Sequence, residues 1–362
     1  MIYFDRAAMS SRYRDALKRV TPGNFLCILC GLVASLLLAL VVLTWQPGEA
    51  HAAKKTYIKL STLAPEGSSW MRQMRLMSKE LEQATQGQVK FKFYPGGVSG
   101  DEKDVIRKMR IGQVHAAGFT GVGLGEILPE VRVLDLPFLF ENDREIAHIY
   151  EKMNGYFADR FEEKGYILLG WVPVGWIHFF SQIDIQSVED LRRTKAWMWE
   201  GDPLVASTYK ELKVSPHSLS VTDVMLSLQT GMIDTVYASP IGALALQWFT
   251  KIESMSALRM GNATGGVLIT KKRFSKLPEK YQQALKRISK KHLRSLVEKV
   301  QEDNNKAIAV MKKNGLKIAP QPSPEQLEKF QRVGELVRQQ LTGKLFEQSL
   351  VDTILKHLQD LR

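Results

Sequence analysis

Cysteine is almost absent from this sequence. Cys27 and Cys30 are the only two among 362 residues, and both lie inside an apolar segment near the N-terminus. Residues 53–362 therefore contain no thiol, which excludes a disulfide and a cysteine-ligated metal site from that part of the chain. The seven histidines are scattered, and no two of them have the spacing of a metal-binding pair. We therefore expect no bound metal.

Motifs of enzyme active sites are absent as well. The segment 118–125 (GFTGVGLG) is rich in glycine, but it lacks the spacing of a dinucleotide or phosphate loop. The sequence has no nucleophile elbow, no His-Glu metal pair and no calcium loop, and no two carboxylates stand out as a paired acid and base. These absences favour binding over catalysis, and they predict a protein without catalytic residues or a cofactor.

One hydrophobic run is long enough to cross a bilayer as a helix. Residues 25–45 (FLCILCGLVASLLLALVVLTW) form 21 residues without a charge, and five Lys/Arg precede them. Ala50, His51 and Ala52 then have the small–x–small pattern of a signal-peptidase site. We expect residues 1–52 to be an export signal cleaved near Ala52, with a retained inner-membrane anchor as the alternative. Both predict that the remaining residues lie in the periplasm.

Positive charge is in excess over the whole chain. The net charge is +12, and residues 1–52 carry five Lys/Arg against three Asp/Glu, which leaves +10 for the rest. The excess is concentrated in residues 271–294 (KKRFSKLPEKYQQALKRISKKHLR), with ten Lys/Arg and one Glu. Apolar residues at roughly helical spacing within this segment predict the solvated face of a helix. A docking surface for a partner protein or anionic lipid is the alternative, whereas export argues against nucleic acid.

Strands and helices alternate along residues 57–262 with short connections. Residues 89–94 (VKFKFY) alternate strictly, which predicts a half-buried strand, and Ser68 or Ser69 can cap the helix before it. Residues 131–140 (VRVLDLPFLF) contain a proline, so we do not expect them to form a central strand. The alternation starts again after Gly175, and amphipathic helix dominates from about residue 275. This order predicts an α/β protein of two lobes with parallel sheets and a helical last third.

Two tryptophans stand close together in residues 191–200 (LRRTKAWMWE). One interpretation is a buried strand whose large side chains fill a core. The other is the wall of a binding cleft. Because side chains in a strand alternate, Trp197 and Trp199 are predicted to share one face.

Several segments resemble the extracytoplasmic solute-binding proteins of TRAP transporters (tripartite ATP-independent periplasmic transporters), the DctP-type family. They are IKLSTLAPEGSSW, FYPGGVSGDEKDVIRKMRIGQV, VLDLPFLFEN, SVEDLRRTKAW, LSLQTGMIDTVYASP and KKRFSKLPEKYQQAL. The similarity covers roughly residues 56–344, in the order and spacing of the family. It implies a periplasmic-binding-protein-like Venus flytrap of two α/β lobes with crossing strands and a long connecting helix. We expect lobe one at 56–174 plus 263–302 and lobe two at 175–262 plus 303–362.

The resemblance also implies a function. Such a protein is not an enzyme: it closes on one small-molecule solute and passes it to a permease made of a small and a large membrane subunit. A periplasmic helical-repeat protein is a further candidate partner. The competing hypothesis is a periplasmic adaptor or scaffold that keeps the fold and docks a partner protein through the basic helix at 271–294. An exported enzyme on the same scaffold is disfavoured, because no catalytic set is present.

The family typically holds an organic acid through arginine, whose planar guanidinium donates two parallel hydrogen bonds to a carboxylate. Aligning the family's motifs places Trp197 and Ile177 at two arginine positions, and Tyr237 at a polar position. Trp197 could instead belong to the core, with the anion site elsewhere. A buried carboxylate without a partner costs roughly several kcal/mol, so we expect a neutral, hydrophobic or aromatic ligand. The predicted binding residues are Trp197, Trp199, Tyr237, Ile177, Trp176 and Phe179, with Phe119 and Thr120 facing them from lobe one.

Overall fold

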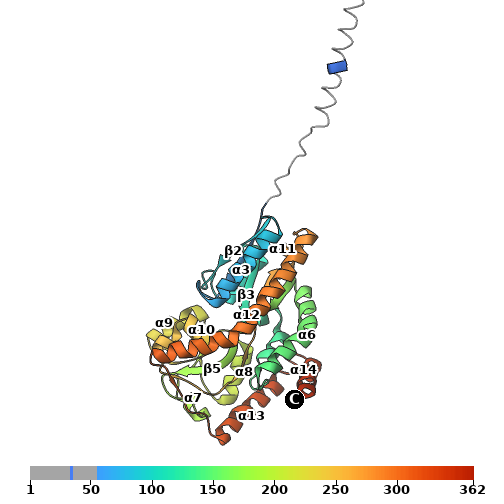
Figure 1. The fold of residues 1–362 in the computed structure, drawn as a ribbon. Helices are drawn as coiled ribbons and strands as arrows, with labels where there is room; N and C mark the ends of the chain where they lie inside the picture. The colour runs from blue at the N-terminus through green and yellow to red at the C-terminus, as the bar shows by residue number, and fades with distance from the viewer. Residues whose placement is uncertain (1–32, 36–54) are drawn as a thin grey trace, which may run out of the picture. The chain divides into compact units, whose positions relative to one another are not determined.

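The computed structural model describes residues 33–35 and 55–362 (Figure 1). Apart from residues 33–35, the predicted export segment lies outside the described residues, so its cleavage or retention stays a prediction. Residues 55–362 form one unit by their backbone contacts. Within the described ranges, no helix combines the length and the apolar character needed to span a membrane.

The first of two main sheets has five strands in the order β2-β1-β3-β11-β4. Their bounds are Val89–Tyr94, Thr56–Thr62, Ala116–Thr120, Gly265–Thr270 and Tyr166–Trp171. The predicted parallel pairing holds for β1 with β2 and β3, whereas β11 runs antiparallel to both β3 and β4. The sheet is mixed because β11 enters it on the chain's return from the second sheet, in the direction opposite to its neighbours.

The second sheet is built around β5, which pairs antiparallel with β8, β9 and β10. A short parallel pair, β6 with β7, joins it through a bridge between Ala196 and Thr235. The predicted parallel sheet is therefore wrong for this half, where antiparallel pairing dominates. The strand bounds are β5 Gly175–Ser181, β6 Trp197–Trp199, β7 His217–Leu219, β8 Thr235–Ala238, β9 Ser254–Met255, β10 Gly261–Ala263 and β12 Lys317–Ile318.

Helices cover both sheets, and several begin where the sequence offers a capping side chain. The hydroxyl of Ser68 accepts a hydrogen bond from the Met71 N–H, which confirms the predicted cap of α3. Residues 131–140 are not a strand, since η1 is a 3₁₀ helix that begins at Pro129. The bounds are α3 Ser69–Ala84, α4 Glu102–Arg110, α5 Gly121–Ile127, η1 Pro129–Asp135, α6 Asp143–Glu163, α7 Val188–Arg192, α8 Pro203–Leu212, η2 Val221–Asp223, α9 Val224–Gln229, α10 Pro240–Ala245 and η3 Trp248–Lys251.

The last third is helical, as predicted, with α11 Lys271–Phe274, α12 Glu279–Lys313, α13 Pro324–Leu341 and α14 Gln348–Leu361. Helix α13 packs against α8, whereas α14 packs against α6, which itself covers β4 of the first sheet. The final helix thus lies beside an element of predicted lobe one, although its residues are assigned to lobe two. The exact lobe boundaries stay a prediction.

The two halves are joined by crossing strands and by the long helix α12. The chain crosses from β4 to β5 and returns from β10 to β11, while α12 packs first on α3 and β4 and then on α10 and β5 (Figure 1). Beside the first crossing, Asn304 Nδ2 donates to the Val174 carbonyl (3.0 Å) and its Oδ1 accepts from the Ile241 N–H (2.9 Å). Gly175 has φ +119°, and a Cβ there would lie 2.5 Å from Asn304 Nδ2, so only glycine fits.

Candidate ligand-binding site

A cavity of about 310 Å³ lies where the ends of strands from the two sheets meet. Residues at the ends of β1, β3 and β11 line it from the first sheet, and residues of β5, β6 and β8 line it from the second. Its size is at the lower end of the range typical of small-molecule sites. Nearly all of the accessible lining is apolar. The volume and the apolar lining of the cavity therefore suit a small and largely apolar molecule.

Aromatic side chains dominate the wall formed by the second sheet. The ring of Trp197 stacks on Tyr237, with centroids 4.8 Å apart and planes at 19°, and meets Trp248 edge-on at 5.2 Å. Trp197 is 1% exposed, and its Nε1 donates to the Leu219 carbonyl (3.0 Å). Trp197 therefore belongs to the hydrophobic core and also lines the cavity. The two interpretations of residues 191–200, a core strand and the wall of a binding cleft, are both correct for this residue.

The structure brings seven of the eight predicted binding residues to the cavity. They are Trp197, Trp199, Tyr237, Ile177, Phe179, Phe119 and Thr120. Trp176 does not line it: the indole donates to Asp143 Oδ1 (2.8 Å), and the Arg259 guanidinium lies over its ring. Side chains alternate along β5, so Ile177 and Phe179 share one face and Trp176 takes the other.

The two halves are held together at the cavity by the carboxylate of Asp101, the N-terminal cap of α4. It accepts hydrogen bonds from Trp199 Nε1 (3.1 Å), Ser220 Oγ (2.6 Å) and the Val221 N–H (3.2 Å). Nearby, Lys103 Nζ donates to the Glu200 carbonyl (2.9 Å). Trp199, Ser220 and Val221 all follow the crossing to β5, while α4 precedes it. The contacts therefore fasten a closed arrangement of the two halves.

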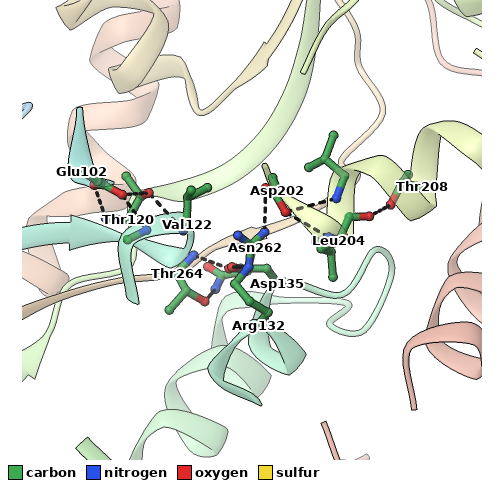
Figure 2. Close-up of polar contacts among 12 residues, drawn as sticks. Glu102, Thr120, Val122, Arg132, Asp135, Asp202, Leu204, Thr208, Asn262 and Thr264 are labelled. Atoms are coloured by element: carbon green, nitrogen blue, oxygen red, sulfur yellow. Dashed lines mark hydrogen bonds and ion pairs between the residues drawn. The ribbon is translucent and has the colours of Figure 1, made fainter. Parts of the chain in front are cut away.

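Three charged residues in the cavity lining, of which two are buried and one nearly so, form one cluster (Figure 2). Arg132 Nε lies 2.9 Å from Asp135 Oδ2, and its terminal nitrogen donates to Asp202 Oδ2 at 3.1 Å. The other oxygens of the carboxylates accept backbone N–H groups: Asp135 Oδ1 from Thr264 (2.7 Å), and Asp202 Oδ1 from Leu204 (3.0 Å) at the start of α8. The guanidinium is thus already paired with two carboxylates.

Sequence reasoning missed this cluster, although a signal for half of it exists. Arg132 and Asp135 stand three residues apart in the apolar run VRVLDLPF. In a 3₁₀ helix, residues i and i+3 lie on the same face. Charged residues at that spacing inside an apolar run are typical of a buried pair. Asp202 comes from a segment 67 residues further along, at the start of α8, and only the tertiary structure brings it to Arg132.

A fourth charged residue, Glu102, lines the cavity from the first residue of α4. It accepts hydrogen bonds from the Thr120 N–H (2.7 Å), the Thr120 hydroxyl (2.8 Å) and the Gly123 N–H (2.7 Å). Burial raises the pKa of Glu102 to about 7, against the lowering effect of these bonds. Burial likewise raises the pKa of Asp135, although the Arg132 charge opposes it. The cavity therefore contains carboxyl groups whose ionisation is held back.

The glycine-rich segment 118–125 has a structural role that its sequence did not reveal. A Cβ at Gly121 would lie 1.9 Å from Asp135 Oδ2, one at Gly123 would lie 2.6 Å from Glu102 Oε2, and one at Gly125 would lie 2.7 Å from Arg132 Cδ. Helix α5 therefore uses glycine where charged side chains of the cavity pack against its backbone.

Residues 60–344 match the family model of the bacterial extracellular solute-binding proteins, family 7 (DctP). The chain belongs to this family. Together with the fold, membership makes it an extracytoplasmic receptor of the TRAP type, which is not an enzyme. TRAP receptors bind small-molecule solutes and work with membrane permease components. The predicted Venus flytrap is confirmed by the fold.

Similar proteins include a solute-binding protein of Verminephrobacter eiseniae, 25% identical over 74% of this chain and 81% of that protein. Shorter matches span about half of two other curated relatives. Among solved structures, the TRAP solute-binding protein of Citrobacter koseri with bound D-glucuronate has a TM-score of 0.76 at 24% identity, covering 83% of this chain and 99% of that one. The sugar-acid-binding protein of Advenella mimigardefordensis with galactonate has a TM-score of 0.80 at 17% identity, covering 85% and 99%. These likenesses show the shared fold.

Proposed function

We propose that this TRAP receptor captures a small neutral, hydrophobic or aromatic ligand between its two lobes, rather than a sugar acid. The observation that carries the proposal is the state of Arg132, whose guanidinium is held between Asp135 and Asp202. It is the only basic residue in the cavity lining within the described part of the chain. Delivery to a small and a large permease subunit belongs to the same proposal, as does the periplasmic location.

The two solved relatives hold D-glucuronate and galactonate, which both carry a carboxylate. A carboxylate in this cavity would meet a guanidinium that two carboxylates already occupy. The positions aligned with the family's arginines hold Ile177 and Trp197, neither of which can donate two parallel hydrogen bonds to an anion. Burying the anion unpaired costs roughly several kcal/mol. The electrostatics of the site thus oppose the ligand class of those relatives.

The proposed binding residues are the seven predicted ones that line the cavity. Ile177, Phe179 and Tyr237 come from the second sheet, and Phe119 and Thr120 come from the end of β3. Trp197 and Trp199 extend this aromatic wall. Their ring centroids lie 5.8 Å apart, and Trp197 stacks on Tyr237. Rings of this kind bind apolar or aromatic groups through their faces.

A thermal-shift panel on the purified exported protein tests the proposal. Apolar and aromatic compounds should raise the melting temperature, whereas D-glucuronate and galactonate should not. Mass spectrometry of what is released on unfolding should find a ligand without a carboxylate. A strong shift with a sugar acid alone would overturn the proposal.

A substitution at the aligned arginine position sharpens this test. Ile177→Arg should create a melting-temperature rise with D-glucuronate that the wild-type protein lacks, because it adds a free guanidinium to the wall. Ile183→Arg is the matched control, since Ile183 is 40% exposed and does not line the cavity. If both variants respond alike to D-glucuronate, the position does not determine the ligand's charge.

A further inference from the structure

Negative charge is in excess among the residues that line the cavity. Glu102, Asp135, Asp202 and Asp303 contribute carboxyl groups, and Arg132 contributes the single guanidinium. A receptor for a neutral molecule needs no such excess. Buried charges in proteins are usually paired, because burying an unpaired one costs a large free energy. The lining therefore offers one positive group to four carboxyl groups, and a positively charged ligand would add a second.

The cluster around Arg132 locates the excess. One guanidinium faces two carboxylates, Asp135 at 2.9 Å and Asp202 at 3.1 Å, so the fully ionised cluster carries one net negative charge (Figure 2). Arg132 and Asp202 are buried, and the Asp135 side chain is 9% exposed. Burial raises the pKa of Asp135, and the nearby Asp202 charge raises it further, whereas the Arg132 charge lowers it.

Asn262 adds an unpaired hydrogen-bond acceptor beside this cluster. It is 2% exposed, and its Oδ1 accepts no hydrogen bond within the described part of the chain. Its Nδ2 donates to the Tyr150 hydroxyl (2.9 Å) and to the Thr264 hydroxyl (3.4 Å), and the Thr264 N–H donates to Asp135. Leaving a buried acceptor unpaired destabilises the folded protein. A ligand that donates a hydrogen bond would remove that destabilisation.

Asp303 supplies further negative charge to the cavity from α12. Its side chain is half-buried and makes no hydrogen bond among residues 55–362, and its charge helps to raise the pKa of Lys306. Glycine at positions 121 and 125 lets Asp135 and Arg132 pack directly against α5, because a Cβ at either position would overlap them. The acidic cluster is therefore accommodated by the backbone around it.

We propose that the ligand is an organic ammonium: an apolar or aromatic body with a protonated amine that donates to Asp135, Asp202 and Asn262. This inference rests on the proposed function: it keeps the hydrophobic or aromatic body and the absence of a carboxylate, and it replaces the neutral character with a positive charge. The positive charge neutralises the cluster, and the amine supplies a donor for Asn262 Oδ1, which accepts no hydrogen bond from any residue that the structure describes, and further donors for the carboxylate oxygens. The surrounding aromatic rings favour the same charge, since a cation is attracted to the face of Trp or Tyr.

Sets of three compounds with one body and different charge test the inference at pH 7. Suitable sets are 2-phenylethylamine, 2-phenylethanol and phenylacetate, with cyclohexylmethyl and hexyl counterparts, measured by calorimetry on the wild-type protein. We expect at least one amine to bind at least tenfold more tightly than its alcohol. If no amine binds more tightly than its alcohol, the ammonium inference is wrong while the proposed function stands. If a carboxylate binds most tightly, both are wrong.

Substitutions locate the charge that is responsible. Asp135→Asn should weaken binding of the best amine by tenfold or more and leave the matched alcohol unchanged. Asp303→Asn removes no hydrogen bond, so it should fold normally and weaken the amine about threefold. Asp352→Asn is the control, because Asp352 is exposed on α14 and touches only Gln348 by hydrogen bond. Unchanged amine affinity in both cavity variants would overturn the assignment.

Discussion

Removing the Ser220 hydroxyl should loosen the closed arrangement of the two halves. Ser220 Oγ donates to Asp101 Oδ2 at 2.6 Å, the shortest of the three bonds that the carboxylate accepts from beyond the crossing. Ser220→Ala deletes this donor and leaves Asp101 itself as the cap of α4. Ser220→Ala therefore removes a contact between the two halves and leaves the N-terminal cap of α4 in place.

The size of the effect follows from the chemistry of the bond. A hydrogen bond to a charged group contributes about 1.5–3 kcal/mol. Asp101 keeps its bonds from Trp199 and Val221, so the carboxylate is not left unpaired and the lower value applies. About 1.4 kcal/mol corresponds to a factor of ten in an equilibrium constant. We therefore expect the open population to rise roughly tenfold.

Hydrogen exchange of the Trp199 indole N–H, followed by NMR without ligand, measures this population directly. The N–H donates to Asp101 only while the halves are closed, so its exchange should become roughly tenfold faster in Ser220→Ala. Ser207→Ala is the control, because Ser207 bonds Gln340 and does not line the cavity. Exchange that changes less than twofold in Ser220→Ala, or equally in the control, would refute the reasoning.

Three further predictions concern the cavity wall. Because the pKa of Glu102 is about 7 in the folded protein and 4.5 ordinarily, its contribution to stability is present below pH 4.5 and lost as pH rises through 7, by roughly 3 kcal/mol. Melting curves from pH 4.5 to 8 should therefore show a weaker pH dependence in Glu102→Gln than in the wild type, and identical slopes would count against the raised pKa. Gly121→Ala should lower the unfolding free energy by displacing Asp135, whereas Gly155→Ala in α6, where a Cβ meets nothing within 4 Å, should raise it by about 0.4–1 kcal/mol. Urea titrations that rank these two variants in the opposite order would contradict the packing described. Trp197→Ala should cost about 3–5 kcal/mol in the same titrations, because Trp197 is 1% exposed, and a cost below 1 kcal/mol would show that the ring is not part of the core.

Local patterns predicted much of the fold. Strict alternation located β2 at residues 89–94, and Ser68 caps α3 as expected. The prediction of parallel sheets was wrong for most of the second half, because strand direction depends on which distant segments pair. Gly175 marks the start of β5. The sequences of β8 and β10, however, contain no pattern that predicts their antiparallel pairing with that strand.

The candidate site was predicted unevenly, and the reason is physical. Wall residues such as Trp197, Ile177 and Tyr237 were predicted because the family's motifs, aligned on this sequence, place them at ligand-binding positions. The charged residues were missed, since Arg132 and Asp135 face the same way only if residues 129–135 are a 3₁₀ helix. Asp202 reaches them only through the folded arrangement. Trp176 was misplaced because strand alternation was not applied along β5.

The contacts of Asn304 bear on how the two halves separate. Its amide bonds the Val174 carbonyl on the crossing segment and the Ile241 N–H at the start of α10. A rotation about Gly175 that opens the cavity pulls on the bond to Val174, because the bond to Ile241 holds the Asn304 amide to the half that follows the crossing. Such a pivot resists small displacements and yields only when the Val174 bond breaks. The receptor should therefore exchange between two discrete states, with a barrier that sets how long a captured solute stays enclosed.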